Sequence, residues 1–334
     1  MAKFRDSEFY EKETIIGIGG KLSTKTEKAK KEDAYNRLVY TRESQSGDDA
    51  VITGRVVGVE ATGSYVAAIV TYEGFKILIE DKEFMDFPEF DPDRYPYPDE
   101  KKMHEVFMNS CIGAEIDFCV LPKIRTNGKS KVIDTIDLDS CVAWASRKSA
   151  MRKRYRQMWC KHRDGSRYIT EGRAVEARVV RVSNTCVFFE SNGVEFKVPI
   201  DELSWSRIEN ARNYFAPGEK HIVRLQKIQY AEDEETTMPE VTASVKQMKE
   251  DPKEKWCRMI NVGEIYLGKI TAQHGNAFFV RLQNGAEVYC IAAKNLSRYP
   301  SNGDECTVAI NIKDTEKNRL FGKIIALSQR DFLL

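Results

Sequence analysis

The chain has 334 residues and a mass of 38.3 kDa, which is long enough for more than one hydrophobic core. Its 52 basic and 51 acidic residues leave a net charge of +1, which excludes a uniformly basic surface. Any affinity for nucleic acid must therefore come from local separation of charge. No apolar run approaches the roughly 18 residues of a membrane helix, and the first residues lack the apolar centre of a signal peptide. We expect a cytoplasmic protein with no membrane partner.

Five segments follow one another after a polar, lysine-rich arm over residues 1–47 that we expect to be partly helical. From residue 50 the sequence becomes a series of short β-rich runs separated by glycines, a texture that returns at 172–200 and 263–292. The predicted domains are a divergent barrel over 48–145 with an acidic and aromatic insertion at about 80–112, a basic helical linker over 146–169, a second barrel over 170–250, a linker helix over 251–259 and a third barrel over 260–330.

The three β-rich stretches share one register. Each begins with a small, a basic and a β-branched residue, which are Gly54-Arg55-Val56, Ala177-Arg178-Val179 and Gly268-Lys269-Ile270. An aromatic residue follows the small residue by eleven positions each time, as Tyr65, Phe188 and Phe279. Three occurrences indicate an internal repeat, and we expect the stretches to superpose without gaps through their first two strands.

This register resembles the OB-fold RNA-binding repeat named after ribosomal protein S-one. The second stretch is the most similar, because residues 193–205 follow the turn and third strand of the family, and residues 241–252 resemble its last strand and the Asp-Pro start of the next helix. The resemblance implies a mainly β fold of three tandem five-stranded antiparallel OB-fold barrels, and single-stranded RNA as the partner. Of the two aromatics and one histidine on the family's RNA face, only the second aromatic is present here. Thr62, Thr185 and Asn276 stand at the first aromatic position.

The aromatic positions are the first candidate binding residues. Side chains alternate along a strand, so we expect Phe188 to point outward while its neighbours Val187 and Phe189 fill the barrel. An outward aromatic side chain offers a stacking surface worth about 1–3 kcal/mol per base. The alternative is that these rings cover the barrel mouth or pack against a neighbouring domain. The candidate RNA-binding residues of the barrels are Tyr65, Phe188 and Phe279 for stacking, and Arg55, Arg178, Lys197 and Lys269 for phosphates.

The linker is the second candidate. Residues 146–167 hold nine basic residues and one acidic residue, and Ser146 is a suitable N-cap for a helix. A charge run of one sign favours a polyanion partner over a merely solvated face. The predicted phosphate contacts are Arg152, Lys153, Arg154 and Arg156.

We therefore predict a non-enzymatic single-stranded RNA-binding protein that acts in translation or RNA handling, with messenger RNA and the ribosome as candidate partners. An enzyme is disfavoured, because three barrels leave little chain for a catalytic domain and no nucleophile–base pair or phosphate loop is present. The eight cysteines form no C-x-x-C pair, so we predict reduced thiols, no metal and no cofactor. Two alternatives remain open: a ribosome- or protein-docking module with degenerate barrels, and a single-stranded DNA-binding protein of a mobile element.

Overall fold

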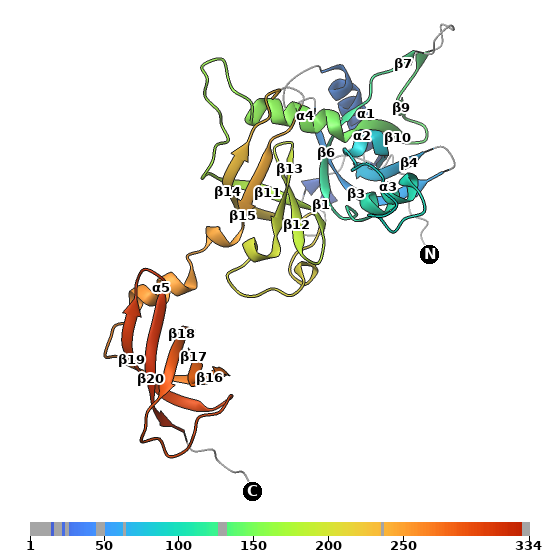
Figure 1. The fold of residues 1–334 in the computed structure, drawn as a ribbon. Coiled ribbons are helices and arrows are strands. Elements are labelled where there is room, and N and C mark those ends of the chain that lie inside the picture. Colours follow the sequence, from blue (N-terminus) through green and yellow to red (C-terminus); the bar gives the residue numbers. More distant parts are fainter. Residues whose placement is uncertain are drawn as a thin grey trace. The chain divides into compact units, whose positions relative to one another are not determined.

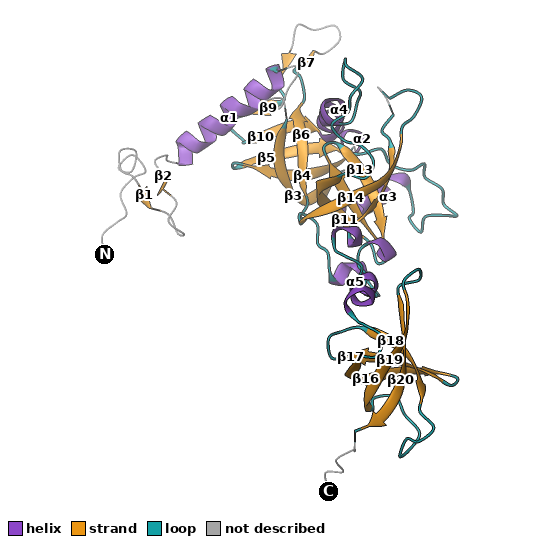
Figure 2. Cartoon of the chain, turned by 90° about the vertical axis from the view of Figure 1, so that its left-hand side faces the viewer, coloured by secondary structure: helices purple, strands orange, loops and turns teal. Residues whose placement is uncertain are grey.

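The computed structural model describes residues 15–16, 22–23, 27–44, 51–62, 65–125, 132–234 and 237–328. The chain divides into two compact units, Met1–Val245 and Lys246–Leu334. The first unit holds two β-barrels and the second holds one (Figures 1 and 2). Each barrel has its own core of buried apolar side chains.

The first barrel has the strand order β5-β4-β3-β6-β10, and a parallel pairing between β5 and β10 closes it. The pairings between neighbours in that order are antiparallel. A short strand, β9, adds to β10, and two small hairpins, β1–β2 and β7–β8, lie outside the barrel. The strands are β1 (Ile15–Ile16), β2 (Leu22–Ser23), β3 (Ile52–Ala61), β4 (Val66–Tyr72), β5 (Phe75–Glu80), β6 (Glu115–Val120), β7 (Ile124–Arg125), β8 (Val132–Ile133), β9 (Ile136–Asp137) and β10 (Val142–Ser146).

The second and third barrels repeat this order. The second is β13-β12-β11-β14-β15. The third is a closed ring that, read from β18, runs β18-β17-β16-β19-β20, and a parallel pairing of β18 with β20 closes it. The prediction of three tandem five-stranded OB-fold barrels is confirmed. Their strands are β11 (Ala174–Val182), β12 (Cys186–Ser191), β13 (Val194–Pro199), β14 (Lys220–Gln229), β15 (Glu240–Ser244), β16 (Ile265–His274), β17 (Ala277–Leu282), β18 (Glu287–Ala292), β19 (Glu305–Asp314) and β20 (Arg319–Leu327).

The glycine that opens the first and third repeats has a steric cause. A Cβ atom added to Gly54 would lie 2.6 Å from Val70 Cγ1, and one added to Gly268 would lie 2.7 Å from Val280 Cγ1. The first strand of each barrel also has an irregularity three residues further on, between Val56 and Gly58 in the first barrel and at the matching places in the other two. The repeat predicted from the sequence is therefore present in the backbone as a shared bulge.

The gap-free superposition is wrong for the first barrel. The residue after the bulge pairs with Phe188 in the second barrel and with Phe279 in the third, but with Ile69 in the first. The hairpin between β3 and β4 is longer by four residues, so Tyr65 lies before β4 begins. In this hairpin the amide of Thr62 donates to the carbonyl of Tyr65. A hairpin insertion shifts every later residue of the strand, and the sequence pattern alone did not reveal it.

Five α-helices are described: α1 (Glu27–Glu43), α2 (Asp81–Phe84), α3 (Glu100–Asn109), α4 (Arg147–Met158) and α5 (Pro252–Met259). Helix α1, within the predicted arm, packs on the first barrel, because Ala34 and Leu38 are buried in its core. Helices α2 and α3 lie in the predicted insertion. Helix α4 begins where the sequence predicted, with Ser146 Oγ accepting from the amide of Ser149. Helix α5 begins at the Asp-Pro pair, and Asp251 caps it.

Candidate nucleic-acid interface

Strand alternation places the two repeat phenylalanines as predicted. Phe189 is fully buried in the second barrel and Phe278 is buried in the third, whereas Phe188 and Phe279 are half-buried on the outer faces. The pattern follows from the pleat, which sends successive side chains to opposite faces. The outward orientation of these two rings is confirmed, and their contact with RNA stays a prediction.

Phe188 is covered by a cation. The guanidinium carbon of Arg181 lies 3.5 Å from the centre of the Phe188 ring, within the range of a cation–π contact. Lys197, another predicted residue, is the cross-strand partner of Phe188 on β13 and is exposed. Arg181 was not among the predicted residues, although its place one residue beyond the bulge on β11 could have identified it.

Helix α4 lies beside this part of the second barrel, and together they form a pocket of about 390 Å³. We call it the Phe188 pocket. It brings together three residues that the sequence predicted separately, namely Phe188, Lys197 and Arg152. The other lining residues are Met85, Asp86, Arg147, Lys148, Met151, Arg181, Glu195, Phe196 and Met238.

The charges of the Phe188 pocket are only partly balanced. Glu195 lies 3.1 Å from Arg147 and 3.5 Å from Arg181, and Asp86 lies 2.5 Å from Lys148. Within the described part of the chain, Arg152 and Lys197 have no carboxylate at ion-pair distance. The pocket therefore has five basic and two acidic side chains, with two exposed cations available to an anion.

The third barrel presents a row of aromatic rings across three strands. Phe279 on β17 pairs with Tyr289 on β18, with 4.9 Å between ring centres, and Tyr289 pairs with Phe321 on β20, with 5.7 Å between ring centres. We call Phe279, Tyr289 and Phe321 the Phe279 row. The predicted Lys269 is exposed on β16, and the guanidinium carbon of Arg319 lies 5.8 Å from the centre of the Tyr289 ring. Tyr289 and Phe321 were missed, although each stands between two buried residues in its strand.

Tyr65 and Arg55 in the first barrel are placed differently. Tyr65 packs edge-on against Trp144, with 5.6 Å between ring centres. Arg55 is exposed, and its guanidinium lies 3.8 Å from Glu115. The position equivalent to Phe188 and Phe279 holds Ile69, so the first barrel lacks an aromatic ring there.

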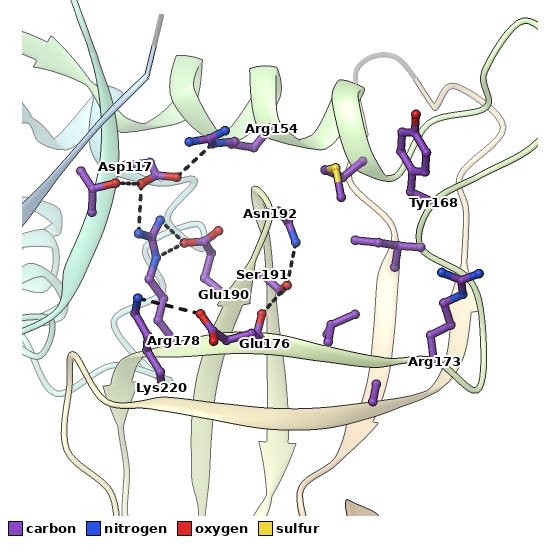
Figure 3. A pocket seen from close by; sticks show the side chains of 15 residues that line it. Asp117, Arg154, Tyr168, Arg173, Glu176, Arg178, Glu190, Ser191, Asn192 and Lys220 are labelled. Atoms are coloured by element: carbon purple, nitrogen blue, oxygen red, sulfur yellow. Dashed lines mark hydrogen bonds and ion pairs between the residues drawn. The ribbon is translucent and has the colours of Figure 1, made fainter. Parts of the chain in front are cut away.

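Arg178 belongs to an ion network at the junction of the first two barrels (Figure 3). Its guanidinium lies 3.0 Å from Asp117 on β6 and donates to Glu190 on β12, and Arg154 of α4 lies 3.4 Å from Asp117. Burial alone would raise the pKa of Asp117, but Arg178 and the hydroxyl of Thr53 hold that pKa below its ordinary value. The network lines a cleft of about 740 Å³ that also includes Arg173 and Lys220. Arg178 is only 13% exposed, so contact with a phosphate would require it to leave both carboxylates.

The basic linker is neutralised in part by the barrels that it joins. Four of its nine basic residues have carboxylate partners from other segments, namely Arg147, Lys148, Arg154 and Arg167. Among the four predicted phosphate contacts, Arg152 and Arg156 are exposed, while Lys153 and Arg154 are half-buried. Burial raises the pKa of the Cys119 thiol, and the charge of the neighbouring Lys153 opposes that rise. One side of α4 therefore forms ion pairs with the two barrels, through Arg147 and Arg154 among others. The other side presents the exposed Arg152 and Arg156.

No described helix is long and apolar enough to span a membrane. The described residues also contain no group of three or more His, Cys, Asp or Glu side chains that could hold a metal ion. Six of the eight cysteines are buried, and Cys141 and Cys160 are half-buried.

A scan against known protein families matches none of them. The chain is 22% identical over 286 residues to 4-hydroxy-3-methylbut-2-enyl diphosphate reductase of Clostridium acetobutylicum, which covers 82% of this chain and 38% of that protein. It is 26% identical over 149 residues to small ribosomal subunit protein bS1 of Mycobacterium tuberculosis, which covers 42% of this chain and 30% of that protein. The chain thus spans about a third of the length of these curated relatives.

Among solved structures, a multidomain protein with nucleic acid binding domains from Streptococcus pneumoniae aligns with 85% of this chain and 75% of its own, at 12% identity and a TM-score of 0.17. A chain of the a/eIF2alpha–aDim2p–rRNA complex from Pyrococcus horikoshii OT3 aligns with 28% of this chain and 61% of its own length, at 20% identity and a TM-score of 0.21.

Proposed function

We propose that this chain is a non-enzymatic single-stranded RNA-binding protein that acts in translation or RNA handling in the cytoplasm. The observation that carries the proposal is the pairing of outward aromatic rings with free cations on two barrels. The second barrel combines Phe188 with Lys197 and the adjacent Arg152. The third carries the Phe279 row, with Arg319 over the Tyr289 ring and Lys269 exposed on the neighbouring strand β16.

The physical match is with an unpaired strand. Rings on the outer face of a barrel can stack on bases that are not already paired, and nearby cations attract the phosphate backbone. A duplex offers its phosphates but hides the faces of its bases, so the rings would gain nothing from it. The weak similarity to small ribosomal subunit protein bS1 supports a nucleic acid partner in general. We propose RNA as the strand and the ribosome as a candidate partner because the repeat register resembles the S-one family.

The first barrel supports a second, separate role as a docking module. It has Ile69 where the other barrels have phenylalanine, and its Tyr65 is engaged by Trp144. Helix α1 and the insertion with α2 and α3 also pack on it. We propose that this barrel supports the second one and contacts protein, while the second and third barrels bind the strand.

The test is a fluorescence-polarisation titration of the full chain against an unstructured RNA, the DNA of the same sequence and a duplex RNA, each at two salt concentrations. We expect the RNA to bind most tightly and its affinity to fall as salt rises. Equal or tighter binding of the DNA would favour the single-stranded DNA alternative. Absence of binding to all three, together with retention on purified ribosomes, would favour the docking alternative for the whole chain.

A further inference from the structure

The Phe188 pocket is assembled from parts that are far apart in the sequence. Met85 follows α2 in the insertion of the first barrel, Met151 and Arg152 belong to α4, and Phe188 and Met238 belong to the second barrel. We propose that this composite pocket receives one unstacked base of the bound strand, with the adjacent phosphates held by Arg152 and Lys197. The proposal rests on the proposed function and adds a site that a single barrel of this type could not form.

The lining suits a flat aromatic ligand. The three methionines are half-buried, and the buried Phe196 lies beside them. Methionine is unbranched and polarizable, so thioethers can pack on the face or edge of rings of different size. The stacked pair of Phe188 and Arg181 forms a further wall. The volume of about 390 Å³ lies within the roughly 300–1,000 Å³ of small-molecule sites, so one nucleotide unit fits.

The charges of the pocket place the phosphate. Arg147 and Arg181 share Glu195, and Lys148 pairs with Asp86, so each of these three cations already has a carboxylate at ion-pair distance. Arg152 and Lys197 are exposed and, within the described residues, have no carboxylate partner. The backbone of a strand that inserts a base is therefore drawn toward Arg152 and Lys197, and the base toward the methionines.

The walls are held in place before any ligand binds. The side chain of Arg147 is 2% exposed and donates to the carbonyl of Phe84 at 3.2 Å and to Glu195 at 3.1 Å, which ties α4 to the first barrel's insertion and to β13. Gly193, in the turn between β12 and β13, has a φ of 87°, and a Cβ there would lie 2.1 Å from the carbonyl oxygen of Met151. Only glycine allows α4 to approach this turn so closely. A preformed pocket pays less ordering entropy when it binds.

The experiment is a double-mutant cycle that combines removal of the Phe188 ring from the protein with removal of one base from the RNA. The RNA is the shortest unstructured oligonucleotide that binds the full chain with full affinity, so that it cannot shift its register. Each base in turn is replaced by an abasic sugar, and affinities are measured for the wild type, for Phe188→Ala and for the matched control Phe279→Ala. We expect one abasic position to weaken wild-type binding about tenfold, to have no effect in Phe188→Ala, and to keep its tenfold effect in Phe279→Ala.

Two results would overturn the pocket while leaving the proposed function intact: an abasic penalty of the same size in Phe188→Ala and the wild type, or a free mononucleotide that binds the wild type as tightly as the oligonucleotide does. The latter would assign the pocket to a free nucleotide. If no oligonucleotide binds the wild type, the proposed function itself fails and the pocket proposal falls with it. Circular dichroism of Phe188→Ala at the assay temperature checks that the variant is folded.

Discussion

The second and third barrels place a phenylalanine at the same point of the same strand, yet surround it differently. Phe188 is covered by Arg181 and enclosed in a pocket that helix α4 and the first barrel's insertion help to build. Phe279 instead begins a row of rings that continues over Tyr289 and Phe321 on the surface of its own barrel. The comparison teaches that the strand register decides which way a ring points, while the neighbouring segments decide whether it meets a ligand as a wall or as an open platform.

The largest expected effect tests the register that the two barrels share. Phe189→Ala removes a fully buried ring and should lower the free energy of unfolding by about 3–5 kcal/mol, whereas the half-buried Phe188→Ala should change it little. Chemical denaturation measures both. Because the two residues are adjacent and chemically identical, only their orientation differs. Equal destabilisation by both variants would mean that the strand register is displaced by one residue.

The next effect concerns the ion network around Arg178 in the first unit. Asp117→Ala should destabilise that unit by about 3 kcal/mol, the low end for breaking a buried ion pair, because Glu190 still faces Arg178. Glu115→Ala, on the same strand, removes only the exposed contact with Arg55 and should change stability by less than about 1 kcal/mol. Thermal unfolding followed by calorimetry measures both, and similar effects of the two variants would contradict a special role for the network.

The same network predicts a dependence on pH. The pKa of Asp117 is lower in the folded chain than its ordinary value, which is about 3.9 in an unfolded chain. Its contribution is therefore complete above that unfolded value and is lost as the pH falls through the lower, folded value. Denaturant titrations between pH 3 and pH 6 should show a shallower loss of stability on acidification in Asp117→Asn than in the wild type. Parallel curves would show that this carboxylate does not titrate differently on folding.

A smaller effect separates an open platform from a pocket. Tyr289→Ala should weaken RNA binding by about 1–3 kcal/mol if a base stacks on the Phe279 row, and Phe321→Ala should do the same. Tyr299 is an exposed tyrosine of the same barrel that lies outside the row, and Tyr299→Ala should leave the affinity unchanged. Fluorescence polarisation with the RNA described above compares the three. A loss confined to Tyr299→Ala would move the binding surface away from the row.

The smallest expected effect concerns the two sides of α4. Arg152→Gln and Arg156→Gln should each flatten the dependence of the logarithm of affinity on the logarithm of salt concentration by about 0.7, one phosphate contact on a single strand. Arg154→Gln should flatten it less, because Arg154 is engaged by Asp117. Titrations at four salt concentrations give the slopes. If Arg154→Gln flattens the slope as much as Arg152→Gln, the ion network opens when RNA binds.

Local rules in the sequence were sufficient to predict the orientation of the strand side chains, the starts of helices and the internal repeat. The alternation that turns Phe188 and Phe279 outward, the Ser146 and Asp251 caps, and the small residue that opens each repeat all depend on a few neighbouring residues or on one adjacent strand. Such features can be read from spacing because backbone geometry imposes periods of 2 and 3.6 residues. The three-barrel fold followed from the repetition of those features along the chain.

Tertiary structure decided which of the predicted cations are free and which rings share a site. The sequence places Arg178 and Lys269 at equivalent positions, but Arg178 faces Asp117 of another barrel while Lys269 is exposed. The contact of Tyr65 with Trp144, the burial of Arg147 and the assembly of the Phe188 pocket likewise depend on segments tens of residues apart. No local period encodes such contacts, because they arise only when separately folded barrels and the helix between them pack together.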